Sequence, residues 1–227
     1  MIYLILGILL VVLILGPQYW AKHVLQKYSG HREDIPGTGE ELVKHLRKKF
    51  NLRHLKVEST EMGDHYDPTD KTVRLSKDNF DKRSLTAITV AAHEFGHALQ
   101  DAKNYKPLNA RTTMVRTAQK LEKVGGVALV IMPLIALTPA GARLALPLFL
   151  VVILSMLVNT VVHLVTLPVE FDASFGRALP ILKEGQYINN NDYLAARKIL
   201  TACALTYLAS SLSGLLNFWR WLRMLRR

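Results

Sequence analysis

The amino-acid sequence predicts a predominantly α-helical chain, in which an α+β domain with a short β-hairpin is seated on a mostly helical membrane base. Two features of the 227 residues lead to this prediction. Three long segments carry no charged side chain, and a charged segment between the first two combines helical periodicity with β-branched alternation. We therefore expect apolar helices and one solvated domain that contains both helices and strands.

The uncharged segments are 20, 19 and 26 residues long and cover residues 2–21, 124–142 and 144–169. A helix that crosses a bilayer needs about 20 apolar residues. We therefore expect an N-terminal transmembrane anchor in residues 1–21 and a transmembrane helical hairpin in residues 124–169. The first segment lacks a basic start and a small-residue cleavage site, so a retained anchor is favoured over a cleaved signal peptide.

The C-terminal residues 199–227 form a weaker apolar segment, which is diluted by serines and ends in alternating basic, aromatic and apolar side chains. This pattern predicts a membrane-associated helix, which either spans the bilayer or lies among the lipid headgroups. Lys22, Lys27 and Arg32 follow the first apolar segment, which has no charged side chain before it. The positive-inside tendency then predicts a multi-pass membrane protein with residues 22–123 facing the cytoplasm.

The net charge of +11 raises the question of nucleic-acid binding. Of the 29 Lys and Arg residues, 20 lie between residues 21 and 123, where they are interleaved with 14 Asp and Glu residues. This is a mixed, solvated surface without a nucleic-acid-binding motif, so the lipid bilayer and not a nucleic acid is the expected partner. Cys203 is the only cysteine, which excludes a disulfide within the chain. No feature of the sequence indicates an oligomeric state.

Capping residues and alternation patterns predict the helices and strands of the α+β domain. Thr38 or Gly39 opens a helix over Glu40–Phe50, which has acidic residues in its first turn and basic residues at its end. Leu55–Ser59 and Thr72–Ser76 alternate and contain enough β-branched residues to form short strands. A turn-rich loop separates these two strands, which are the expected β-hairpin.

A further helix is predicted from an N-cap at Ser84 to about Asn104, before Pro107. Its apolar stretch is too short to cross a bilayer, and charged residues flank it on both sides. The helix is therefore expected to lie outside the hydrocarbon layer.

This helix carries His93-Glu94-Phe95-Gly96-His97, the H-E-x-x-H arrangement of zinc hydrolases. Helix residues i and i+4 lie one above the other, so His93 and His97 can hold one Zn²⁺ ion, with Glu94 beside it. Gly96, in mid-helix, either leaves room for the metal and substrate or permits close helix packing.

A catalytic zinc site usually has three protein ligands and one open position. Glu170 is the expected third ligand, because it directly follows the third apolar segment and the predicted hairpin returns it to the side of His93. The other histidines, among them His65 and His163, are alternatives. Asp172 is expected to accept a hydrogen bond from a ligand imidazole and so to orient it.

These motifs resemble those of the YugP-type neutral zinc metallopeptidases of bacterial membranes. Besides the anchor and the hairpin, the resemblance rests on Asp64-His65-Tyr66-Asp67-Pro68, Val73-Arg74-Leu75-Ser76, Ala91-Ala92-His93-Glu94-Phe95-Gly96-His97-Ala98 and Leu167-Pro168-Val169-Glu170-Phe171-Asp172-Ala173-Ser174.

The resemblance implies a zincin-like, gluzincin-type catalytic region over residues 22–123, with the zinc site completed by Glu170 from the segment 170–198. The broader gluzincin group usually has a helper Asp four residues after this Glu. The present chain has Ser174 at that position, and its nearest acid is Asp172.

The sequence thus predicts a membrane-anchored, zinc-dependent endopeptidase of a bacterial inner (plasma) membrane, with Glu94 as general base for a zinc-activated water. Its expected substrates are proteins or peptides associated with the membrane. Two hypotheses extend this prediction. His65 or Tyr66 donates a hydrogen bond to the tetrahedral oxyanion, and the strand Thr72–Ser76 offers its edge to an extended substrate.

Two other functions are compatible with the sequence. One is a non-catalytic membrane scaffold or holdase that zinc stabilises. The other is a zinc hydrolase that cuts a non-peptide amide at the membrane surface. The first has no need of a general base beside the metal, which favours the peptidase.

Overall fold

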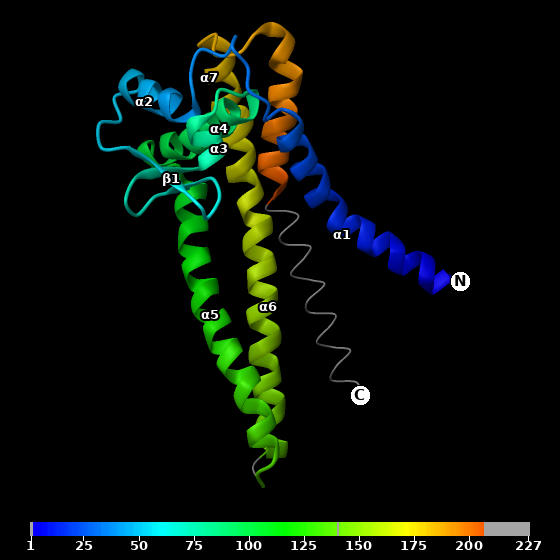
Figure 1. Ribbon diagram of the computed structural model, residues 1–227. Helices are drawn as coiled ribbons and strands as arrows, with labels where there is room; N and C mark the ends of the chain where they lie inside the picture. The colour runs from blue at the N-terminus through cyan, green and yellow to red at the C-terminus, as the bar shows by residue number, and fades with distance from the viewer. Residues whose placement is uncertain (1, 140, 207–227) are drawn as a thin grey trace.

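Two long antiparallel helices, α5 (Lys106–Ala136) and α6 (Gly141–Phe171), extend from a head of helices and strands in this computed structural model (Figure 1). The structure describes residues 2–139 and 141–206. Helix α1 (Ile2–Lys27) leaves the head in a different direction from the pair. The predominantly helical character predicted from the sequence is confirmed.

Helix α4 (Leu85–Ala102) lies at the centre of the head, and every residue from Leu85 to Gln100 is buried. Ser84 begins the helix as predicted, because its Oγ accepts a hydrogen bond from the backbone N–H of Ala87 at 3.0 Å. The helix ends at Ala102, close to the predicted end. Burial on all sides makes α4 a rigid support for the side chains that it carries.

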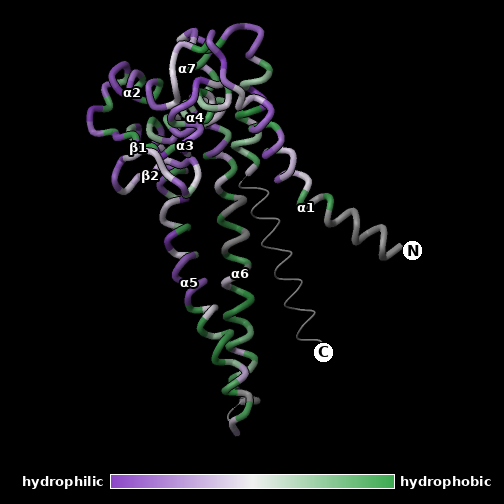
Figure 2. Tube along the Cα trace, viewed as in Figure 1, coloured by the Kyte–Doolittle hydropathy of each residue, from purple (hydrophilic) through white to green (hydrophobic). Residues whose placement is uncertain are grey.

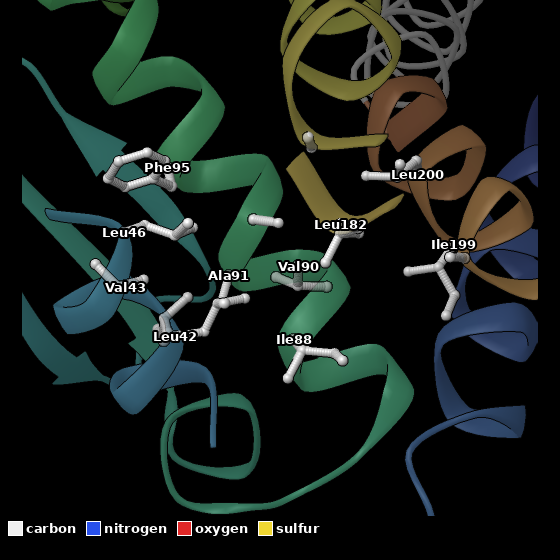
Figure 3. Packing of buried hydrophobic residues seen from close by; sticks show 14 of the residues in the cluster. Leu42, Val43, Leu46, Ile88, Val90, Ala91, Phe95, Leu182, Ile199 and Leu200 are labelled. Carbon is white, nitrogen blue, oxygen red and sulfur yellow. The ribbon is translucent and has the colours of Figure 1, made fainter. Parts of the chain in front are cut away.

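Apolar side chains from two parts of the chain cover α4 (Figure 3). On one side lies α2 (Gly39–Lys49), with Leu42, Val43 and Leu46. On the other side lie Leu182 of α7 (Leu179–Glu184) and the residues Ile199 and Leu200. The core of the head therefore joins segments that are separated by more than 130 residues in sequence.

The predicted helix Glu40–Phe50 is confirmed, with bounds one residue earlier at each end. Thr38 is its N-cap and forms a capping box with Glu41. The Thr38 hydroxyl accepts from the Glu41 backbone N–H, and the Glu41 carboxylate accepts from the Thr38 backbone N–H. This reciprocal pair explains why the helix begins where it does.

The sheet has three strands, β1 (Lys56–Thr60), β2 (His65–Asp67) and β3 (Thr72–Ser76), in the order β1-β3-β2. The two predicted strands are present, but they pair in parallel and are not the arms of a hairpin. The hairpin is formed by β2 and β3, which pair antiparallel. Sequence analysis missed β2 because three residues inside a turn-rich loop are too few to show alternation.

The pairing of β3 corrects the prediction that this strand offers an edge to a substrate. β1 pairs along all of β3 on one side, and β2 pairs with Thr72, Val73 and Arg74 on the other. Only Leu75 and Ser76 have no partner on the β2 side, so β3 offers no continuous edge to a further strand. The short helix α3 (Lys77–Asp81) follows β3 directly.

The long helix pair is larger than the predicted hairpin of residues 124–169. α5 begins at Lys106, with Pro107 in its first turn, where the missing N–H of proline costs nothing. α6 continues through Pro168 to Phe171. The far part of the pair is apolar (Figure 2), and its exposed side chains include Val130 (70% exposed) and Leu134 (63%).

The three predicted membrane spans coincide in position with parts of α1, α5 and α6. Within residues 2–139 and 141–206, no helix combines the length and the apolar character that a membrane span requires.

After α6 the chain forms a π-helical segment, η1 (Asp172–Ala178), which leads into α7. A 3₁₀ turn, η2 (Asn190–Asp192), then precedes a helix that the structure describes over residues 193–206. Arg32 fixes this region to the start of the chain through an ion pair with Asp192 at 2.7 Å. Most of the predicted C-terminal helix, residues 207–227, lies outside the described residues.

Candidate zinc site

Helix α4 brings His93 and His97 together on one face, with their ring centroids 4.8 Å apart. Glu170, near the end of α6, reaches the same point from the other side. Its Oε2 lies 3.3 Å from Nε2 of His93 and 3.2 Å from Nε2 of His97. The structure therefore brings the three predicted ligands into one cluster.

Glu170 is fully buried, and its second oxygen, Oε1, lies 3.3 Å from the guanidinium of Arg111 on α5. Burial acts to raise the pKa of this carboxyl group. The charges and hydrogen bonds of His97 and His93 outweigh burial and hold the pKa below its usual range. Glu170 is thus a carboxylate, the form that can bind a cation.

Both imidazoles are oriented through the nitrogen that faces away from Glu170. Nδ1 of His97 donates to Oε1 of Gln100 at 2.9 Å. Nδ1 of His93 donates to Oγ of Ser174 at 3.0 Å, and this hydroxyl donates in turn to the Leu200 carbonyl at 3.3 Å. These bonds direct both Nε2 atoms toward the centre of the cluster, as metal-binding histidines require.

Asp172 acts on the cluster through Gln100 and not by the direct contact that was predicted. The Gln100 amide donates to Oδ2 of Asp172 at 2.8 Å and to the Val169 carbonyl at 2.8 Å. Arg177 also donates to Oδ2 of Asp172, at 2.7 Å. Asp172 therefore fixes the orientation of the Gln100 amide, whose oxygen accepts the hydrogen bond from Nδ1 of His97.

Gln100 and Ser174 contact the two histidines and were not among the site residues predicted from the sequence. The sequence contains one weak signal for Gln100, which is its position three residues after His97 on the same helix face. Ser174 lies four residues after Glu170, and its hydroxyl accepts a hydrogen bond from Nδ1 of His93. A neutral hydroxyl thus supports one imidazole of this site.

The three side chains fit a zinc ion. Their ligand atoms lie within 4.8 Å of one another, and all three residues are buried. A tetrahedral Zn²⁺ with bonds of about 2.0–2.1 Å separates its ligand atoms by roughly 3.3 Å. The two distances from Oε2 to the Nε2 atoms, 3.2 and 3.3 Å, match that separation. Two neutral imidazoles and one carboxylate are also a donor set typical of catalytic zinc.

Glu94 lies beside the cluster and is 7% exposed. Together with His93 and Asp64 it lines a cavity of about 280 Å³. Burial raises the pKa of Glu94 to about 7, against the lowering effect of His93. A bound divalent cation would lower the pKa of this neighbouring carboxyl group and so favour the ionised form of Glu94 near neutral pH.

The Asp64–Pro68 motif lies next to the site, and its polar atoms are engaged in local structure. Asp64 accepts from the backbone N–H of Ser76 at 2.7 Å and from Asn79 at 2.8 Å. Nδ1 of His65 donates to the Gly63 carbonyl at 2.8 Å. These bonds hold the loop against the start of α3.

Tyr66, the other residue considered for the oxyanion, directs its hydroxyl to Asp101, to which it donates at 2.6 Å. Burial and this hydrogen bond raise the pKa of Tyr66 above its usual range, so the phenol stays protonated. Asp101 follows His97 by one helix turn, and Tyr66 therefore braces α4 beside the cluster. Whether His65 or Tyr66 also contacts a substrate oxyanion stays a prediction.

Gly96 permits a close approach between α4 and η1, which supports the second of its two predicted roles, close packing. A Cβ atom at this position would lie 2.7 Å from the Ala173 carbonyl oxygen. This backbone lies between Asp172 and Ser174, so any displacement of η1 would also move the residues that support the cluster. The mid-helix glycine thus serves close packing, at a cost of about 1 kcal/mol in helix propensity.

Replacing Gln100 with Leu or Ser174 with Ala is expected to weaken zinc binding by about 10- to 100-fold, because each imidazole loses the acceptor that orients it. Competition with a chromophoric chelator measures this affinity. Gln26→Leu is the matched control, since Gln26 is exposed on α1. Unchanged affinity in both site variants, with the fold intact, would contradict the orienting role.

A buried pair of helical histidines, a glutamate from another helix and an adjacent Glu94 define a zinc-peptidase type of site. Comparison with protein families agrees with this class. The chain belongs to the family described as "Putative neutral zinc metallopeptidase", whose model matches residues 3–226. The resemblance found in the sequence motifs is therefore confirmed.

One relative is the "Putative membrane protease YugP" of Bacillus subtilis (strain 168). The two chains are 36% identical over 223 residues, which cover 95% of this chain and 94% of the relative. No solved structure matches the chain.

Proposed function

We propose that the chain is a zinc-dependent endopeptidase, in which His93, His97 and Glu170 hold the zinc ion and Glu94 is the general base. One observation carries the proposal. The Nε2 atoms of both histidines face a single buried carboxylate oxygen at 3.2 and 3.3 Å, while their Nδ1 atoms are engaged by Gln100 and Ser174. This arrangement leaves three inward-facing donors of the zinc-binding type.

When bound, a zinc ion supplies Lewis acidity, which lowers the pKa of a water molecule and polarises a substrate carbonyl. The residues of the chain do the rest. The Glu94 carboxylate takes the proton of the attacking water and passes it to the nitrogen of the leaving amine. Gln100, Asp172 and Ser174 keep the imidazoles in one tautomer and orientation while this proton moves.

Two cavities support an endopeptidase, which cuts within a substrate peptide, over an exopeptidase, which cuts at its end. One, of about 280 Å³, is lined by His93 and Glu94, and the other, also of about 280 Å³, is lined by His97. Each of the two predicted histidine ligands lines one of these cavities, and the two linings share no residue. An extended peptide can thus occupy space on both sides of the bond to be cut.

The same proposal includes a lipid bilayer as partner and membrane-associated proteins or peptides as substrates. The exposed apolar side chains of α5 and α6, among them Val130 and Leu134, support it. So does the name of the relative, which is described as a membrane protease. The basic residues that follow the first apolar segment favour a cytoplasmic position for the head.

Flotation with liposomes measures this association directly. The full chain is expected to float with vesicles that contain anionic lipid, because exposed apolar and basic side chains both favour the bilayer surface. Val130→Glu combined with Leu134→Glu is expected to shift protein to the unbound fraction. Equal flotation of the double variant and the wild type would show that this part of α5 does not contact lipid.

Metal removal and reloading tests the catalytic proposal. Purified full-length protein is expected to contain about one zinc per chain, to lose casein hydrolysis when a strong chelator removes the metal, and to regain it with zinc. Hydrolysis that persists in metal-free protein would overturn the zinc mechanism. A zinc-loaded protein that cuts no peptide bond would favour the scaffold, or the hydrolase of a non-peptide amide, instead.

A further inference from the structure

The cavity on the His97 side of the cluster carries two arginine side chains. Its lining includes Tyr66, Asp67, His97, Arg111, Arg116 and Gln119, and its volume is about 280 Å³. Arg111 and Arg116 lie in the first part of α5, which begins at Lys106. The lining therefore combines a predicted metal ligand with two permanent cations.

The single acidic side chain in this lining is engaged by other groups. Asp67 lies 3.1 Å from the Arg74 guanidinium and accepts a hydrogen bond from the Thr69 backbone N–H at 2.8 Å. These contacts hold the pKa of Asp67 below its usual range, with the backbone hydrogen bond as the largest cause. The negative charge of Asp67 is thus paired with Arg74, while Arg111 and Arg116 supply the positive charges of the lining.

Arg111 is the cation nearest to the reaction centre. Its side chain is 18% exposed, and its Nη1 lies 3.3 Å from Oε1 of Glu170, whose other oxygen faces the two histidines. A guanidinium presents five N–H donors, so it can contact Glu170 and a substrate group at the same time. Burial also weakens the screening that water gives to an exposed arginine.

The cavity that His93 lines carries acidic side chains instead. Glu94 and Asp64 line it, together with His93, and neither of the two arginines takes part. A peptide that crosses the site would therefore pass from an acidic side to a basic side. This polarity can select both the position of a charged residue and the direction in which the peptide binds.

We propose that the cavity lined by His97, Arg111 and Arg116 is a subsite for a carboxylate of the substrate, with Arg111 as its main contact. This inference rests on the proposed peptidase function and names the class of peptide that it cuts. Guanidinium groups pair with carboxylates through two parallel hydrogen bonds, which gives them geometric selectivity that an ammonium lacks. The carboxylate is that of a Glu or Asp side chain or that of a peptide C-terminus.

Binding of matched peptides to full-length, zinc-loaded Glu94→Gln protein tests the proposal, because this variant is expected to bind peptides but to cut them about 10²- to 10⁴-fold more slowly. The probes are fluorescein-labelled octapeptides of Ala and Leu in which each position in turn is Glu or Gln. Each peptide is made with a C-terminal carboxylate or a C-terminal amide. Fluorescence anisotropy gives the dissociation constants in the background of Arg111→Gln, Arg111→Lys and Arg143→Gln.

A peptide with a carboxylate on one side of the scissile bond is expected to bind on the order of tenfold more tightly than the matched peptide with an amide there. The ratio of these two dissociation constants is the quantity compared between variants. Arg111→Gln is expected to remove this ratio, and Arg111→Lys to keep part of it. Arg143→Gln, an exposed arginine in the first turn of α6, is expected to leave the ratio unchanged. If only the peptides with a C-terminal carboxylate and a C-terminal amide differ in affinity, the carboxylate that binds is that of the peptide C-terminus.

Two outcomes would overturn the inference. One is a ratio that persists in Arg111→Gln. The other is an equal loss of affinity for Glu and Gln peptides, since an arginine that only supports Glu170 affects both alike. The zinc content of each variant is measured in parallel, so that weaker peptide binding caused by loss of the metal is recognised.

Casein hydrolysis by the zinc-loaded wild type separates failure of the inference from failure of the proposed function. Hydrolysis without any carboxylate preference removes the subsite and leaves the peptidase. Absence of hydrolysis removes the peptidase and the subsite with it.

Discussion

Glu94→Gln is expected to lower the rate of peptide hydrolysis by about 10²- to 10⁴-fold, the usual contribution of a positioned general base. The amide has nearly the same shape as the carboxylate but cannot accept the proton of the attacking water. Zinc per chain is expected to stay unchanged, because Glu94 is not one of the three residues whose ligand atoms form the cluster. The variant thus separates catalysis from metal binding.

Hydrolysis of a quenched fluorescent casein substrate and elemental analysis of zinc are the two measurements. Glu122→Gln is the matched control, since Glu122 is exposed on α5. Retained turnover in Glu94→Gln, with Glu122→Gln equally active, would remove Glu94 from the mechanism. Loss of zinc from Glu94→Gln would instead mean that the helix no longer holds the histidines in place.

Glu170→Ala is expected to lose zinc almost completely after dialysis. It removes one of three buried ligands, and the loss of affinity should exceed the roughly 100-fold that marks the upper end for residues that only orient a ligand. The reason lies in the geometry, since Oε2 of Glu170 is the atom that both Nε2 atoms face at 3.2 and 3.3 Å. Without it, the two imidazoles retain no anionic partner at the metal position.

Glu170→Gln, which keeps the shape and removes the charge, is expected to lose zinc as well. Glu184→Ala is the matched control, because Glu184 is exposed at the end of α7. Full zinc content in both Glu170 variants would show that another residue is the third ligand. His65 and His163 would then be tested next, and the side chain of His163 lies outside the described part of the structure.

Several features of the fold follow from neighbouring residues, and these were predictable. The capping box of Thr38 and Glu41 starts α2, and the Ser84 cap starts α4, as each local sequence indicates. The approach of His93 to His97 follows from the helix repeat alone. Such features depend on contacts within a few residues, and no knowledge of the rest of the chain is needed to predict them.

The position of Glu170 was predictable by a different argument, from the return of the chain after a helical hairpin. The structure brings its carboxylate to the histidines across more than 70 residues of sequence. The strands β1 and β3 were found by their alternation, yet their parallel pairing was not, because β2 enters between them in sequence and pairs on the far side of β3. Pairing depends on long-range packing, which alternation does not encode.

The sequence by itself determined the chemistry of the site, since the motif spacing on α4 places two imidazoles and a carboxylate on one helix turn whatever surrounds it. Only the tertiary structure decided which residues support that chemistry. Ser174 reaches the His93 imidazole, and Asp172 reaches the Gln100 amide that contacts His97, because η1 runs against α4. The missing side chain of Gly96 makes that approach possible. The physical reason is that helix geometry is a local property, whereas the meeting of two backbones depends on the packing of the whole head.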